Sequence, residues 1–319
     1  MPLHYARKLA FVSNPAFIPV SLVSPLRIVC LVPSITELIV EMGLADYVVG
    51  RTGYCIHPAQ RVAAIPKVGG TKTVNIDKIR KLAPTHLIVN VDENEKSTVD
   101  ALREWVPQVV VTHPQTPLDN LALIDQLAGT FAAALTEPTR NAGPDPLRAT
   151  NLIAVNDLMT RTTALKQQVF TRLRALEAGR SQRRPQRVLY LIWQDPWMTV
   201  ARDTYISRML GLIGWQTWPA LEGGDGRHTP GAARYPVLLG DEPWLAQIDR
   251  VLLSSEPYCF NASHLAQVQN WLPHAQVQLV DGELLSWYGS RAVLGLDYLA
   301  GLSVALDAEG CADGLASPA

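Results

Sequence analysis

Residues 151–178 contain neither proline nor glycine. Apolar residues such as Leu158, Leu165 and Val169 recur there at helical spacing, which predicts one uninterrupted helix. At 1.5 Å per residue that helix is about 40 Å long. A rod of this length is long enough to join two lobes, one on each side of it in the sequence.

Short apolar runs alternate with helical patterns on both sides of this rod. Strands are expected at 27–32, 47–50, 85–90, 108–112, 187–192, 249–255 and 276–280. Helices are expected at 34–43, 75–83, 96–105, from 117 onward, and at 203–213, 242–248, 262–271 and 290–306. Such alternation produces mostly parallel sheets covered by helices on both faces. The predicted fold class is therefore α/β, with two Rossmann-like lobes joined by a single long helix.

The chain length of 319 residues fits about two domains at roughly 150 residues each. The sequence predicts an N-terminal extension at 1–26, a first lobe at 27–150, a connecting helix at 151–180, a second lobe at 186–308 and a tail at 309–319.

Charge and cysteine content exclude several classes of protein. The net charge is −1, whereas nucleic-acid binding needs a clustered excess of Lys and Arg. The four cysteines lie far apart with no Cys-x-x-Cys pair, unlike a zinc site or a dense disulfide framework. No clean run of about 20 apolar residues is present, so no membrane span is expected.

The N-terminal residues resemble a secretory signal in one respect. Arg7 and Lys8 precede the uncharged residues 9–26. Asn14 and three prolines interrupt that stretch, and proline disrupts the helix that a signal forms. We therefore expect a cytoplasmic protein, with a periplasmic one as the alternative if Leu9 to Ser24 acts as a signal.

Ligands of open α/β sheets bind beyond the carboxyl ends of the strands. The segments there are PSITE at 33–37, GYCIHP at 53–58, VGGT at 68–71, NVDEN at 90–94, WQDPWMT at 193–199, SEPY at 255–258, DGE at 281–283 and SWYGSR at 286–291. In the first of these, Ser34 and Glu37 have the spacing of a capping box, which predicts a helix start. Cys55 and His57 point the same way on an extended segment, because they are two residues apart.

These segments resemble the ABC-transporter substrate-binding proteins whose two lobes are joined by one rigid helix, the group that binds vitamin B12, siderophores and haem. The similarity extends over about residues 20–306 and is carried by RIVCLVPSITELIVEMG, VVGRTGYCIHP, PKVGGT and WQDPWMTVARDTYISRMLGLIG. The Y-C-x-H-P element is similar to the cobalamin-binding branch, often called helical-backbone metal receptors. The resemblance implies a class III periplasmic-binding-protein fold and a corrinoid or related metal chelate held in a cleft, without a covalent cofactor.

The resemblance also implies ligand contacts at Tyr54, Trp193, Trp197 and Glu283. From the same loops we add Ser34, His57, Gly70, Thr71, Asn90 and Trp287, with His57 as a candidate metal ligand. Core packing is the alternative for each aromatic residue. Binding is favoured for Trp197, and the two roles are evenly balanced for the other three. Asp92, Glu93 and Glu95 are expected to form a solvated face.

Two alternatives to the corrinoid remain open. A ferric siderophore or haem could occupy the same fold, with Arg51, Lys72 and Arg291 as the basic groups for an anionic chelate. An enzyme could use Cys55 as a nucleophile, assisted by His57 or Glu283.

A permease partner is implied by the resemblance, through one exposed acidic residue on each lobe. Asp77 matches this position in the first lobe. The helix expected at 203–213 offers Arg208 and no carboxylate after Asp203, which argues against engagement of a permease.

Overall fold

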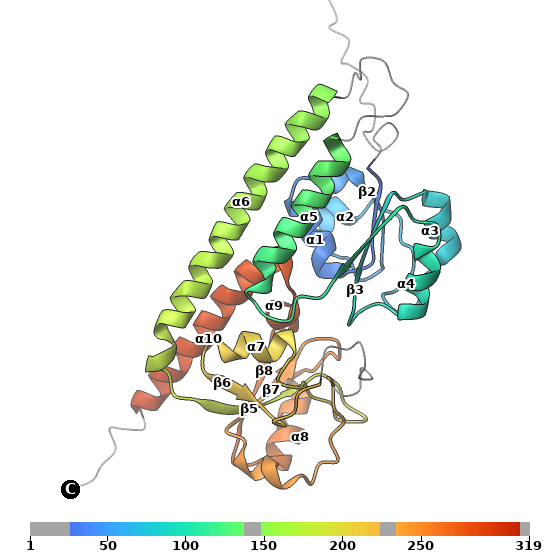
Figure 1. Ribbon diagram of the computed structural model, residues 1–319. Helices are drawn as coiled ribbons and strands as arrows, with labels where there is room; N and C mark the ends of the chain where they lie inside the picture. Colours follow the sequence, from blue (N-terminus) through green and yellow to red (C-terminus); the bar gives the residue numbers. More distant parts are fainter. Residues whose placement is uncertain (1–25, 137–147, 224–233, 313–319) are drawn as a thin grey trace, which may run out of the picture.

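The computed structural model describes residues 26–136, 148–223 and 234–312. Two lobes, each built on a four-stranded parallel sheet, lie along one long helix (Figure 1). The predicted fold class is confirmed. The predicted extension up to residue 25, the signal at Leu9 to Ser24 and the last residues of the tail lie outside the described residues.

The first lobe contains the sheet β2-β1-β3-β4. Its strands are β1 (Ile28–Cys30), β2 (Val48–Arg51), β3 (His86–Asn90) and β4 (Gln108–Thr112). Its helices are α1 (Pro33–Glu41), η2 (Ala45–Tyr47), α2 (Ala59–Val62), α3 (Ile76–Leu82), α4 (Lys96–Arg103) and α5 (Asp119–Thr136).

Alternate residues of β1 face opposite layers of this lobe. Ile28 and Cys30 are buried in the core that contains residues of α1 and α5. Val29 and Leu31 are buried in the core that contains residues of α3 and α4. Because successive side chains of a strand point to opposite faces, a strand covered on both sides is apolar throughout.

The second lobe repeats this plan with the sheet β6-β5-β7-β8. Its strands are β5 (Gln186–Leu191), β6 (Trp215–Thr217), β7 (Arg250–Ser254) and β8 (Gln276–Val280). Its helices are η3 (Arg180–Gln182), α7 (Tyr205–Gly211), η5 (Pro243–Gln247), α8 (Ala262–Trp271), α9 (Gly282–Ser286), η6 (Gly289–Arg291) and α10 (Ala292–Ala312). In β5, Val188 and Tyr190 face the α7 and α10 layer, whereas Leu189 and Leu191 face the α8 layer.

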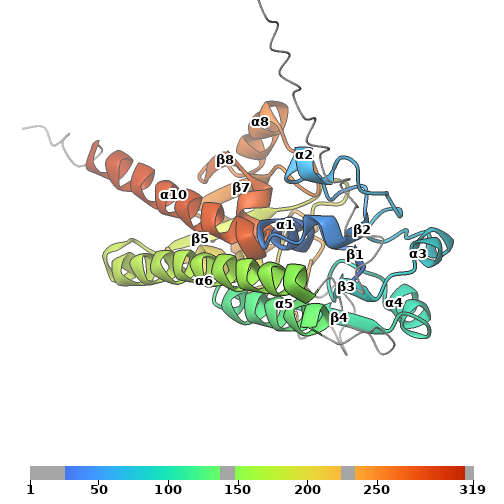
Figure 2. The ribbon, with the colours of Figure 1, turned by 90° about the horizontal axis from the view of Figure 1, so that it is seen from above.

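Helix α6 (Arg148–Gly179) joins the lobes. Its 32 residues make a rod of about 48 Å, which runs beside α5 and α10 (Figures 1 and 2). Leu158 is buried in the core of the first lobe, and Val169 and Leu173 are buried in that of the second. One rigid element is thus anchored in both hydrophobic cores, so bending between the lobes requires repacking of at least one core.

The start of α1 differs from the prediction. The residue at the N-cap position is Val32, with no side-chain cap, and Ser34 lies inside the helix. The predicted capping box is therefore wrong. The carboxylate of Glu37 instead accepts two hydrogen bonds from Arg291, which is far away in the sequence.

Candidate ligand-binding site between the lobes

The loop after β2 presents alternating side chains to solvent and to the protein. Tyr54 is 64% exposed and Ile56 is 49% exposed, whereas Cys55 between them is fully buried. The loop is tied to its neighbour by a hydrogen bond of 2.7 Å from the Gly53 amide to the Gly69 carbonyl. An aromatic ring that is exposed on an anchored loop offers a flat surface to a ligand.

The same loop reaches the second lobe through His57. Its Nε2 lies 3.0 Å from Oε2 of Glu283, at the start of α9. The imidazole also meets the ring of Trp287 edge-on, with 5.6 Å between centroids. The indole N–H of Trp287 is directed elsewhere, to Glu256 Oε1 at 2.7 Å. The structure therefore brings together three residues that the sequence predicts for the site.

A chain of charged groups continues from Glu283. Its Oε2 lies 3.0 Å from Nη1 of Arg291, which in turn donates two bonds of 2.7 Å to Glu37 on α1. Bidentate pairs of this kind are among the stronger and more directional polar contacts. The chain therefore ties α9 and η6 of the second half to α1 of the first lobe.

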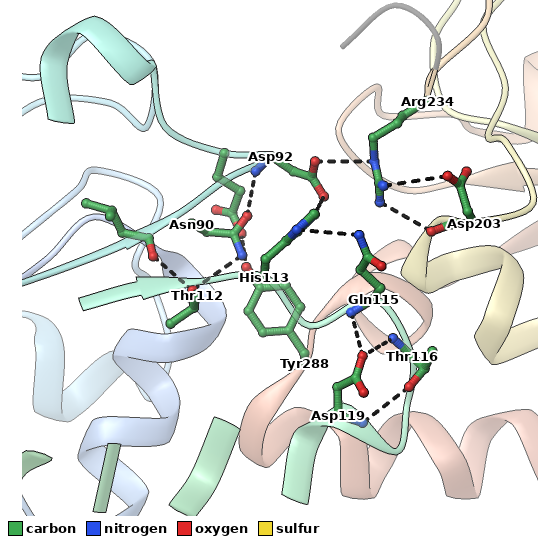
Figure 3. A network of polar contacts seen from close by, with 12 residues as sticks. Asn90, Asp92, Thr112, His113, Gln115, Thr116, Asp119, Asp203, Arg234 and Tyr288 are labelled. Atoms are coloured by element: carbon green, nitrogen blue, oxygen red, sulfur yellow. Dashed lines mark hydrogen bonds and ion pairs between the residues drawn. The ribbon is translucent and has the colours of Figure 1, made fainter. Parts of the chain in front are cut away.

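A second polar bridge joins the lobes at the loop after β3. Arg234 Nε lies 3.3 Å from Asp92 Oδ1, and Arg234 Nη1 lies 3.9 Å from Asp203 Oδ2 (Figure 3). Burial favours a higher pKa for Asp92, but the hydrogen bond with His113 and the charge of Arg234 outweigh it, so the pKa is lowered.

Glu93, next to Asp92 in the sequence, contacts Tyr288. The hydroxyl of Tyr288 donates to Glu93 Oε1 at 2.6 Å. Burial raises the pKa of Glu93 to about 7, because the hydrogen bond from Tyr288 only partly offsets the loss of hydration and Glu256 adds a negative charge nearby. The expectation that these carboxylates form a solvated face is therefore wrong for Asp92 and Glu93. Both residues come directly after a predicted strand, and this position was the sequence signal that could have indicated a place at the site.

The tryptophans that follow β5 have different environments. Trp193 is 40% exposed and meets Tyr258 edge-on, at 5.5 Å between centroids. Trp197 stacks on Phe260 at 6.0 Å and on Trp271 at 5.6 Å, within the α8-side core of the second lobe. These contacts favour packing for the partly buried ring of Trp197, and its role in binding stays a prediction.

Other predicted site residues are engaged within the first lobe. Asn90 is buried, and its side chain bonds to Thr112 and to the Asp92 amide. The Thr71 carbonyl accepts a bond from the Asn94 amide group, and Ser34 is buried in α1. Gly70 adjoins the exposed aromatic, because an added Cβ would lie 3.5 Å from Tyr54 Cε2. Of this group, Gly70 is the residue that shapes the surface around Tyr54.

The thiol of Cys55 has the environment of a structural cysteine. Its Sγ lies 3.1 Å from the hydroxyls of both Thr36 and Thr52. Burial raises its pKa despite these hydrogen bonds, so the nucleophilic thiolate is disfavoured. Among the described residues, no group of three or more His, Cys, Asp or Glu side chains is placed to hold a metal ion.

Two cavities lie away from the His57 loop. One, of about 340 Å³, is lined by α1, α6 and α10 residues, including Glu41, Arg161 and Leu294. The other, of about 520 Å³, lies at the end of α6 beside Gly214. The first also borders Glu37 and Arg291, so the charged chain from His57 ends at its wall.

The fold and the contacts between the lobes define a two-lobed protein braced by one helix, with its candidate site at the meeting of the lobes. The family model described as periplasmic binding protein matches residues 28–134. None of the curated proteins matches the chain.

Solved structures share the fold over most of the chain. The periplasmic heme-binding protein HutB of Vibrio cholerae is 24% identical, with a TM-score of 0.63, and the match covers 88% of this chain and 99% of that one. The periplasmic vitamin B12 binding protein BtuF of Vibrio cholerae is 20% identical, with a TM-score of 0.59 and coverage of 86% and 95%. S. aureus IsdE, complexed with heme, is 14% identical, with a TM-score of 0.64 and coverage of 87% and 98%.

These findings confirm the predicted fold, and over residues 28–134 they confirm the resemblance to periplasmic binding proteins. The matched family and these relatives are binding proteins. The expected cytoplasmic location is wrong, because the matched family, HutB and BtuF are described as periplasmic, which points to an extracytoplasmic location. That expectation rested on the prolines of residues 9–26 and on the lack of a docking carboxylate after Asp203 in the second lobe. Within the described part of the chain, no helix has the length and apolarity to cross a membrane.

Proposed function

We propose that the protein is a solute-binding protein that holds a metal-centred tetrapyrrole, a corrinoid in the first place, between its two lobes. The observation that carries the proposal is the loop after β2. It exposes the ring of Tyr54 and extends His57 to Glu283 of the other lobe. Flat aromatic surface next to a few oriented polar groups is the usual composition of a site for a large planar ligand.

The proposed contact set comprises Tyr54, His57, Gly70, Trp193, Glu283 and Trp287. Tyr54 and Trp193 supply exposed ring faces from opposite lobes. His57 supplies an imidazole, the side chain most often presented to a metal. In this proposal the ring faces contact the apolar surface of the ligand, the polar groups orient it, and the protein binds it without turnover.

Haem is the second candidate for the same site. The imidazole of His57 favours it, because haem iron is commonly held by a histidine. A ferric siderophore is a weaker candidate, since the basic groups that would attract an anionic chelate are engaged. Arg51 donates to the carbonyls of Val62 and Thr52, Lys72 to that of Asp92, and Arg291 to Glu37.

We further propose that the loaded protein delivers its ligand to an ABC importer. An ABC transporter substrate-binding protein from Listeria monocytogenes shares the fold at 14% identity, with a TM-score of 0.59 and coverage of 86% of this chain and 96% of that one. Asp77, exposed in the first turn of α3, is the candidate docking carboxylate of the first lobe. A charge in this position would orient the encounter with a basic partner.

Titration with three chelates tests the proposal. Cyanocobalamin, diaquocobinamide and haemin are added separately, and absorbance and the thermal midpoint are followed. A chelate at 100 times its Kd stabilises the fold by about 2.7 kcal/mol. We expect Tyr54→Ala and Trp193→Ala to weaken binding. Phe170→Ala, which truncates an exposed aromatic on α6, is the matched control and should bind normally. Failure of all three chelates to bind would overturn the proposal.

A further inference from the structure

His57 uses one of its two ring nitrogens inside the protein. Nε2 lies 3.0 Å from Glu283 Oε2 and 3.4 Å from Oε1. Nothing in the described part of the chain hydrogen-bonds to Nδ1. An ionised carboxylate can only accept hydrogen bonds, so a neutral imidazole in this contact carries its proton on Nε2. The lone pair of the ring is then on Nδ1.

Glu283 also forms an ion pair with Arg291. Arg291 Nη1 lies 3.0 Å from Glu283 Oε2, and the other side of that guanidinium donates to both oxygens of Glu37. The side chains of Arg291 and Glu37 are each 12% exposed, and the guanidinium lies over the Trp287 ring at 5.0 Å. Arg291 therefore holds the carboxylate that contacts His57, and Glu37 and Trp287 in turn hold the guanidinium of Arg291.

We propose that Glu283 is a positioning residue, which fixes the His57 tautomer and presents Nδ1 as an axial ligand to the metal of a bound chelate. The inference rests on the proposed function and names the atom through which the site would bind metal. Histidines that ligate metals almost always donate their other ring N–H to a carboxylate, a carbonyl or water, which orients the ring and raises its basicity. Here the carboxylate comes from the second lobe and the histidine from the first, so the imidazole is oriented only when the lobes are in contact.

This arrangement selects among chelates. A metal can accept Nδ1 only where an axial position is open or exchangeable, as in haemin and diaquocobinamide. Both axial positions of cyanocobalamin are filled, so the imidazole adds nothing to the affinity of the protein for this chelate. Glu283 and His57 should therefore influence the binding of the first two chelates and leave that of cyanocobalamin unchanged.

The tautomer is tested first, on the ligand-free full-length chain. Long-range ¹H–¹⁵N correlation spectra are recorded near pH 8.5, where an ordinary imidazole is neutral. The wild type and Glu41→Gln, which alters an exposed carboxylate of α1, should both show the proton of His57 on Nε2. Glu283→Ala should lose this preference. A proton on Nδ1 in the wild type would overturn the inference whatever the protein binds.

Metal ligation is tested next with haemin and diaquocobinamide. We expect Glu283→Ala to lower the affinity for both chelates by 10- to 100-fold, which is the usual loss when the carboxylate that hydrogen-bonds to a ligating histidine is removed. The variant should also change the absorption bands that report the axial ligand. His57→Ala should lose the same bands, and the double variant should lose little more. Unchanged bands and affinity in both single variants would overturn this inference alone. Binding of no chelate by the wild type would overturn the proposed function and the ligand role of His57 with it.

Discussion

Arg234 of the second lobe lies 3.3 Å from Asp92 of the first, with its side chain only 2% exposed. Asp203 lies on its other side, at 3.9 Å within the second lobe. A guanidinium removed from water needs such partners, because an unpaired buried charge is strongly unfavourable. The contact between the lobes thus depends in part on a buried ion pair in addition to the shared helix α6.

Removing the first-lobe partner of this pair should destabilise the protein. We expect Asp92→Ala to cost about 3 kcal/mol of the free energy of unfolding, because it removes a carboxylate that lies 3.3 Å from the buried guanidinium of Arg234. Urea unfolding followed by tryptophan fluorescence measures the change. Asp100→Ala, which removes an exposed pair with Lys96 on α4, should cause no measurable change. Equal effects of the two variants would contradict the role given to Asp92.

Glu93 should make stability depend on pH. Its pKa is about 7 in the folded protein and about 4.5 for the ordinary side chain, so the folded state binds more protons between these values. Stability contributed by this group is then present below about pH 4.5 and is lost as the pH rises through about 7. The urea midpoint of the wild type should fall over this range relative to that of Glu93→Gln.

The comparison isolates Glu93, because the other titrating groups are common to both proteins. Glu95→Gln is the control, since Glu95 is an exposed neighbour paired with Lys72. Parallel pH profiles for the wild type and Glu93→Gln would show that burial does not raise the pKa of this carboxyl.

Two glycines should respond to alanine in opposite directions. Gly129 lies within α5 with nothing within 4 Å of an added Cβ, so Gly129→Ala should stabilise the protein by about 0.5–1 kcal/mol. Gly69 has φ +121°, and an added Cβ would collide with the carbonyl oxygen of Thr73. Gly69→Ala should therefore lower the thermal midpoint and disturb the loop that supports Tyr54. A Gly69→Ala protein as stable as the wild type would refute this account of the loop.

Alkylation should separate the buried thiol of Cys55 from the exposed thiol of Cys259. Cys55 is buried and burial raises its pKa, whereas Cys259 is exposed. Iodoacetamide at neutral pH should label Cys259 first and leave Cys55 unmodified while the protein is folded, because the thiolate is the reacting form. Peptide mass spectrometry reads out both sites in one sample. Rapid labelling of Cys55 would revive the alternative of a cysteine-dependent enzyme.

Much of the fold could be predicted because its elements have strong periodic patterns. Strand β3 is an apolar run between turn signals, and α6 has helical spacing without proline or glycine. Strand β6, at Trp215–Thr217, was not predicted, since three residues are too few to show alternation. The predicted capping box failed because α1 begins at Pro33, so Val32 is the N-cap residue and Ser34 already lies inside the helix.

The site was predicted less completely. Tyr54 and Glu283 could be named through the resemblance to a known family, and His57 because it lies in a loop beyond the carboxyl end of a strand, where α/β ligands bind. Arg234 and Tyr288 were missed as partners of Asp92 and Glu93, since contacts between the lobes leave no local spacing in the sequence. Composition could not separate Trp193 from Trp197 either, because the difference lies in the rings that pack around each of them.

A crystal structure of the protein loaded with haemin or diaquocobinamide tests the central claim most directly. We predict the macrocycle between the lobes, against Tyr54 and within reach of His57, with α6 still one continuous helix. A macrocycle bound instead in the cavity lined by Glu41 and Arg161, with the loop after β2 free of ligand, would contradict the account.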